Sequence, residues 1–319
     1  MIDVLVPCSG NPFVDIIFTG LPHVPAPGED VIAENVTIVA GGSLTSAVVL
    51  TRLGYKVLYE AHLGRDFASR FLIETMENEG MPTDAVTIHD DARACVTVAY
   101  NHQNDRSFLS YEHPTPLPNP DLVDRYRPRA VLIDGLRLGE PLLETLRRSR
   151  RVGALRLADA SDNAPTLAVP GFDELLAQLD VLNLNEREAM RLACRDRLED
   201  ALEILKARVP VIALKLGARG SRAFFPFGDV QLPAIPTTPV DFTGCGDNFF
   251  AALTAALLDG KLINECLAWG NAAGSLAATA PGGTSLRYTK KELLDLVDRH
   301  YGDLPPLDPL RLVTLEENE

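Results

Sequence analysis

The stretch VDFTGCGDNFF at residues 240–250 carries the strongest signal in this sequence. Gly244 and Gly246 let the backbone turn sharply, because they have no side chain to obstruct it. Asp247 follows, and the small and apolar residues after it predict a helix over 248–259. The first turn of a helix attracts anions through its free N–H groups and its dipole. A carboxylate there either caps the helix or takes a proton from a hydroxyl that attacks a phosphoryl group.

The rest of the chain alternates short apolar segments with amphipathic ones. Strands are expected at 1–9, 56–63, 130–135, 154–158, 181–184, 209–216 and 221–225. Helices are expected at 42–54, 68–80, 141–151, 248–259 and 263–280. This alternation predicts an α/β fold with a mainly parallel sheet and helices on both of its faces.

Two segments interrupt the alternation. Residues 14–39 place three prolines between β-type runs, and residues 94–111 read as an extended hairpin with a polar turn. From the residues alone, these segments are either ordinary surface hairpins or a small β-sheet laid over one edge of the large domain.

Composition narrows the classes of partner. A chain of 319 residues with 46% hydrophobic content can build one large α/β domain. The formal net charge of -14 argues against nucleic acid and against anionic membrane surfaces as partners. No apolar run reaches the length of a membrane span. The five cysteines are scattered without a CxxC pair, so we expect no zinc site, no disulfide framework and a reducing, cytoplasmic location.

The motifs, taken in order, resemble the ribokinase, or PfkB, family of carbohydrate kinases. Residues 241–249 are similar to the family signature D-T-x-G-A-G-D-x-F. The resemblance implies that Asp247 is the catalytic base and that Gly244, Cys245 and Gly246 form an anion hole for the phosphoryl group of ATP. Cys245 replaces the usual alanine; we do not expect a nucleophile, because a neighbouring aspartate raises a thiol pKa.

The N-terminal motif also resembles the family pattern. Gly41 and Gly42 open the segment that ends in Arg-Leu-Gly at 52–54, and the resemblance implies that they border the substrate. The family usually has asparagine where this chain has Ser46, so that substrate contact is altered. Asn11 and Asp15 resemble a first-strand segment in which an aspartate binds sugar hydroxyls.

Asn185 and Glu188 match the family motif N-x-x-E after a predicted strand. The resemblance implies that they organise water around Mg²⁺ near the phosphates, with Asn185 assigned to the nucleotide and Glu188 to the metal. The alternative is ordinary helix-start chemistry, because asparagine and early glutamate both suit a helix N-terminus. A monovalent cation is a further candidate cofactor.

Lys215, Gly217 and Gly220 resemble the family loop that borders the nucleotide. Asn271 lies where the family places a residue beside the adenine, and Gly283 falls in the loop after that helix. The small residues around Asn271 are equally explained by close helix packing.

Arg137 follows a buried strand on the side where the family builds its substrate pocket. In kinases resembling sulfofructose kinase, an arginine near this place holds an anionic group, which suits a guanidinium fork. The alternative is a surface arginine paired with Glu140 or Glu144. Asp159 and Asp162 follow the next strand and are candidates for the same cleft.

The resemblance implies a single ribokinase-like domain over residues 1–319, with a β-sheet lid from about 12–39 and 92–112. The leading hypothesis is ATP-dependent phosphorylation of a sugar hydroxyl. The alternatives are a nucleoside kinase of the same fold and a non-catalytic regulator that binds a sugar or nucleotide. A homodimer through the lid is also expected, because the edge strands of the lid need covering.

Overall fold

The computed structural model describes residues 2–102, 105–161 and 163–302, and within them it contains a large sheet of eight strands. Their order is β14-β13-β12-β11-β10-β9-β1-β4. Neighbours from β4 to β12 pair in parallel, whereas β13 and β14 are antiparallel. The strands are β1 (Val4–Val6), β4 (Val57–Tyr59), β9 (Ala130–Asp134), β10 (Leu155–Asp159), β11 (Val181–Asn185), β12 (Val211–Lys215), β13 (Ser221–Phe225) and β14 (Gly228–Leu232).

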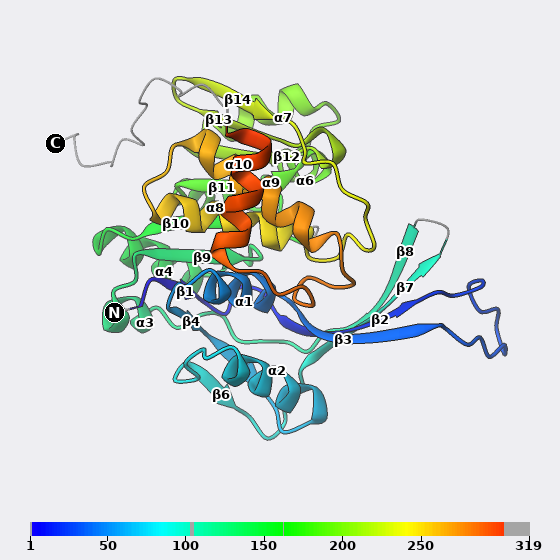
Figure 1. Cartoon of the computed structure of the whole chain (residues 1–319). Helices are drawn as coiled ribbons and strands as arrows, with labels where there is room; N and C mark the ends of the chain where they lie inside the picture. The colour runs from blue at the N-terminus through cyan, green and yellow to red at the C-terminus, as the bar shows by residue number, and fades with distance from the viewer. Residues whose placement is uncertain (1, 103–104, 162, 303–319) are drawn as a thin grey trace.

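Helices cover both faces of this sheet, as the alternation of the sequence predicted (Figure 1). Successive side chains of a strand point to opposite faces, so Leu132 of β9 packs into one core while Val131 and Ile133 pack into another. The first core includes α1, α8, α9 and α10, and the second includes α3 to α7. The helices are α1 (Leu44–Arg52), α2 (Phe67–Asn78), α3 (Asp121–Tyr126), α4 (Glu140–Arg151), α5 (Phe172–Leu176), α6 (Glu186–Ala193), α7 (Leu198–Lys206), α8 (Cys245–Leu258), α9 (Ile263–Ala277) and α10 (Lys290–Tyr301).

No helix in the described part of the chain combines the length and apolar character that a bilayer span requires.

The two interrupting segments form one small sheet, which confirms the predicted lid. Its order is β3-β2-β7-β8, and in Figure 1 it projects away from the large sheet as a curved arm. The strands are β2 (Pro12–Thr19), β3 (Asn35–Gly42), β7 (Cys95–His102) and β8 (Asp105–Tyr111). The side chains of residues 101–106 lie outside the part of the chain that the structure describes.

The strand expected at 56–63 and the helix expected from residue 42 are among the predicted elements that differ from the structure. The single strand expected at 56–63 is divided into β4 and β5 (Ala61–Leu63), and β5 pairs with β6 (Val86–Ile88) instead of the large sheet. The division falls at Glu60, whose buried carboxylate accepts the N–H groups of Cys8 at 3.0 Å and Asn119 at 2.8 Å. The helix expected from residue 42 begins at Leu44, because the preceding glycines end lid strand β3.

Candidate active site

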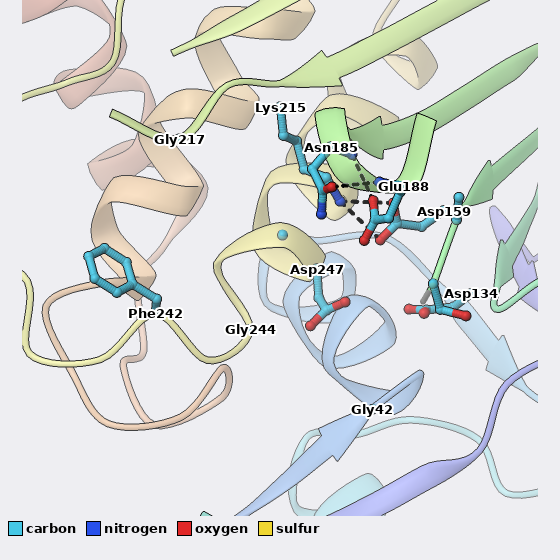
Figure 2. A pocket seen from close by; sticks show the side chains of 13 residues that line it. Gly42, Asp134, Asp159, Asn185, Glu188, Lys215, Gly217, Phe242, Gly244 and Asp247 are labelled. Carbon is cyan, nitrogen blue, oxygen red and sulfur yellow. Dashed lines mark hydrogen bonds and ion pairs between the residues drawn. The ribbon is translucent and has the colours of Figure 1, made fainter. Parts of the chain in front are cut away.

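Polar residues end four neighbouring strands of the large sheet. Asp134 ends β9, Asp159 ends β10, Asn185 ends β11 and Lys215 ends β12. Register places Asp134 opposite Asp159 and Asn185 opposite Lys215, so the four ends lie at one edge of the sheet. They line a cavity of about 570 Å³ (Figure 2). Its size and its place at the carboxyl ends of parallel strands are typical of a small-molecule site.

The first turn of α8 and the glycine before it line this cavity. Gly244 precedes the helix at φ 75°, and a Cβ there would lie 2.2 Å from the Cα of Gly283. Only glycine therefore allows these two backbones to pack together. Asp247 lies in the first turn and lines the cavity. The N–H of Cys245 donates to the carbonyl of Phe242 at 3.3 Å, and its thiol is 3.9 Å from the carbonyl of Asp241.

The cavity concentrates negative charge. Burial raises the pKa of Asp247 well above its ordinary value, and the nearby Asp134 and Asp159 raise it further, while Lys215 acts in the opposite direction. Burial and Asp159 raise the pKa of Asp134 to about 6. The Lys215 ammonium donates to the two carboxyl oxygens of Asp159 at 2.9 and 3.3 Å. Asp159 therefore partly neutralises the Lys215 ammonium group. Cations or hydrogen-bond donors on a ligand would stabilise the other carboxyl groups of the cavity.

The lid contributes a further carboxyl group. Asp15 of β2 is 8% exposed, and its Oδ2 lies 1.9 Å from the place that a Cβ of Gly41 would occupy. Gly41 therefore makes room for this carboxyl group. Burial and Asp241 raise the pKa of Asp15 to about 6. Asp15 also raises the pKa of Asp247, so the lid residue acts electrostatically on the cavity.

Ser46 connects α1 to the cavity. Its hydroxyl donates to Oδ2 of Asp134 at 2.9 Å and lies 3.4 Å from the backbone carbonyl of Asp247. Ser46 itself is fully buried. Its hydroxyl therefore positions Asp134 from below the cavity.

Arg137 is held by backbone carbonyls. Its Nη2 donates to the carbonyls of Thr115 and Pro116, each at 2.8 Å. The hydroxyl of Thr115 in turn donates to Oδ1 of Asn11 at 2.5 Å. Glu140 and Glu144, the expected alternative partners, pair instead with arginines of α4, namely Arg147, Arg148 and Arg151.

Asn185 and Glu188 form a capping box at the start of α6. The N–H of Glu188 donates to Oδ1 of Asn185 at 2.9 Å, and the N–H of Asn185 donates to Oε2 of Glu188 at 2.7 Å. Both residues nevertheless line the cavity. Within the residues the structure describes, no group of three or more His, Cys, Asp or Glu could hold a metal. Oxygen donors without such a cage fit Mg²⁺, which keeps several waters and uses few protein ligands.

The residues that were predicted to bind the nucleotide differ in whether they line the cavity. Lys215 and Gly217 line the cavity. Gly220 shapes the turn after β12 at φ 88°, where a Cβ would lie 2.0 Å from the carbonyl of Leu232. Asn271 donates to the carbonyl of Pro233 at 3.2 Å and to the hydroxyl of Tyr301 at 3.1 Å, and it is not among the residues that line the cavity.

Comparison with the predicted site shows which residues the fold brings together. The predicted residues that line the cavity are Gly42, Asp159, Asn185, Glu188, Lys215, Gly217, Gly244, Gly246 and Asp247. Sequence reasoning missed Asp134, Ala160, Ser161 and Phe242. Asp134 carried a usable signal, because it is the polar residue that ends a buried strand, as Asp159 does. Asp162 lies outside the described residues.

The large parallel sheet, the cavity at its strand ends and the small β-sheet match the ribokinase-like fold that the sequence predicted. The family model of pfkB carbohydrate kinases matches residues 5–290, and the chain belongs to this family, whose members are enzymes that phosphorylate sugars. The chain is 28% identical to the ribokinase of Bacillus subtilis over 301 residues, or 89% of this chain and 97% of that relative.

Solved structures show the same fold. Arabidopsis thaliana ribokinase, solved with ribose and ATP, aligns with a TM-score of 0.77 at 24% identity, covering 93% of this chain and 99% of the other. The nucleoside kinase of Methanocaldococcus jannaschii aligns with a TM-score of 0.75 at 18% identity, covering 94% and 99%.

Proposed function

We propose that the protein transfers the γ-phosphoryl group of ATP to a hydroxyl of a sugar or sugar-like molecule, with Asp247 as general base. The observation that carries the proposal is the placement of the Asp247 carboxyl group. It stands in the first turn of α8, beside glycine backbone, in a cavity formed by the ends of four strands. The Asp247 carboxylate thus lies beside backbone N–H groups that can bind an anion. This arrangement suits a reaction in which the carboxylate takes a proton while negative charge develops on a neighbouring phosphoryl group.

In this mechanism the acceptor hydroxyl lies between Asp247 and the γ-phosphorus of ATP. As its oxygen bonds to phosphorus, the proton passes to the Asp247 carboxylate and the bond to ADP breaks. The N–H groups of Gly244, Cys245 and Gly246 stabilise the charge on the transferred group. Cys245 would give up its long hydrogen bond to Phe242 to do so. Asn11, Asp15, Gly41, Gly42 and Ser46 border the acceptor.

Asn185 and Glu188 are the residues that would hold Mg²⁺ through water, and the metal would neutralise charge on the phosphates of ATP. The excess of carboxyl groups in the cavity supports this assignment. Lys215 and Gly217 would contact the phosphates from the ends of β12 and its turn. Closure of the lid would exclude water that otherwise hydrolyses ATP.

The nucleoside kinase remains the competing enzyme, since solved nucleoside kinases share the fold. A non-catalytic regulator would have no need for a carboxyl group at the position of Asp247. One experiment separates the three: purified protein with Mg·ATP is screened for ADP release against ribose, fructose, other sugars and nucleosides. Release with a sugar supports the proposal, release with nucleosides alone favours the competitor, and a failure with every acceptor points to the regulator.

Association through the lid is also proposed. The lid exposes large apolar side chains, which are Val36, Ile38, Phe108, Leu109 and Tyr111. Exposed apolar surface next to edge strands favours pairing with a second copy. A cytoplasmic location stays a prediction of the cysteine pattern.

A further inference from the structure

Asp134 lines the cavity, but the proposed phosphoryl transfer gives it no role. Figure 2 shows its side chain at the end of β9, with Asp247 on the neighbouring wall and Gly42 below. Its Oδ2 accepts the hydroxyl of Ser46 at 2.9 Å. Because that hydroxyl has one proton, which Asp134 receives, Ser46 has no donor left for a ligand. The pair therefore offers a ligand only the carboxyl group of Asp134, as an acceptor.

Lys215 is the basic residue among those that line the cavity, and its ammonium group is paired with another carboxyl group. The Lys215 ammonium donates to Asp159 at 2.9 and 3.3 Å. Nη2 of Arg137 donates to the carbonyls of Thr115 and Pro116, each at 2.8 Å. Asp134 has the carboxyl groups of Asp159 and Asp247 as electrostatic neighbours; burial and Asp159 raise its pKa to about 6, and the Lys215 charge offsets this rise only in part. A hydrogen-bond donor on the ligand would stabilise the ionised carboxyl group of Asp134. An anionic group on the ligand would instead be repelled by it, in a place where little water screens the charges.

We propose that Asp134 is a specificity-determining residue, which accepts a hydrogen bond from a hydroxyl or ammonium group of the acceptor and excludes acceptors with an anionic group at that place. The inference rests on the proposed function, because it assigns the chemistry of the acceptor in the same cavity. It predicts an acceptor without an anionic group at this place, whereas the resemblance implied that Arg137 holds an anionic group of the acceptor.

The test compares acceptors that differ in charge. Values of kcat/KM are measured by ADP release for ribose, fructose and glucose, for glucosamine as the ammonium form, and for gluconate and glucuronate as anionic forms. Wild type is compared with Asp134→Asn, which keeps the size of the side chain and removes its charge. Ser46→Ala keeps the carboxylate and removes only the hydroxyl. Glu60→Gln is the matched control, since Glu60 is a buried acid that does not line the cavity.

Wild type should prefer its best neutral sugar over both anionic sugars by at least about 10-fold, since hydrogen bonds to charged groups correspond to roughly 10-fold to 100-fold in affinity. Asp134→Asn should lower the glucosamine-to-glucose ratio and raise the anionic-to-neutral ratio, each by about 10-fold. Ser46→Ala, which removes the hydrogen bond that positions Asp134, should shift both ratios in the same direction as Asp134→Asn but by less, and Glu60→Gln should retain the wild-type ratios.

Two results would overturn the inference while leaving the proposed function intact: efficient turnover of an anionic sugar by wild type, or unchanged ratios in Asp134→Asn. Absence of turnover with every sugar would instead defeat the proposed function, and the inference with it. Thermal unfolding of each variant identifies a folding defect; if Asp134→Asn unfolds, the wild-type and Ser46→Ala ratios still decide.

Discussion

Replacement of Asp15 by asparagine should stabilise the protein at neutral pH. Asp15 is buried beside Gly41, and burial together with Asp241 raises its pKa from 3.8 to about 6. The folded state therefore binds the Asp15 proton more tightly than the unfolded state does. The wild-type contribution of this residue to stability is consequently greatest when it is protonated, and it is lost as pH rises through about 6.

The magnitude follows from the size of the shift. A rise of about two pKa units corresponds to about 3 kcal/mol, at about 1.4 kcal/mol per unit. Asparagine has nearly the shape of the protonated acid but carries no charge at any pH. Asp15→Asn should therefore raise the free energy of unfolding by up to about 3 kcal/mol at pH 7.5, by about half as much at pH 5, and by little at pH 4.

Urea unfolding of both proteins between pH 4 and 8, without ligands, measures this difference. Asp90→Asn is the matched control: Asp90 is an exposed aspartate whose pKa is lowered by the Arg65 side chain, so its replacement should act with the opposite sign. An increase in the free energy of unfolding of Asp15→Asn that does not change with pH, or a decrease at every pH, would refute the reasoning that Asp15 is a destabilising buried carboxylate.

Two further predictions concern the metal and association. Glu188→Gln should raise the Mg²⁺ concentration needed for half-maximal turnover with little change in the urea midpoint, because glutamine still completes the capping box; an unchanged Mg²⁺ dependence would contradict the assignment of Glu188. The wild-type protein should sediment as a dimer, and Leu109→Glu, which places a charge on a side chain 73% exposed in the lid, should shift it to monomer; a wild-type monomer at all working concentrations would exclude lid pairing.

The sequence predicted the layers of the fold because strand and helix periodicities are local properties. The family resemblance indicated Asn185 and Lys215, and the structure places both at the ends of buried parallel strands, which meet at one edge of the sheet. The contact between Ser46 and Asp134 could not be anticipated, because it joins residues 88 positions apart through tertiary packing. The strand break at Glu60 was hidden for the same reason, since both hydrogen-bond partners of its carboxylate come from distant segments.

Turnover by Asp247→Asn, on the acceptor that the screen identifies, tests the central claim most directly. Asparagine preserves the size of the side chain but cannot accept the proton. The rate constant kcat should therefore fall by about 10²- to 10⁴-fold, which is the usual range for loss of a general base, while ATP affinity changes little. If Asp247 only caps the helix, kcat should barely change in this variant, because asparagine caps about as well as aspartate. Near-normal turnover in this variant would contradict the account.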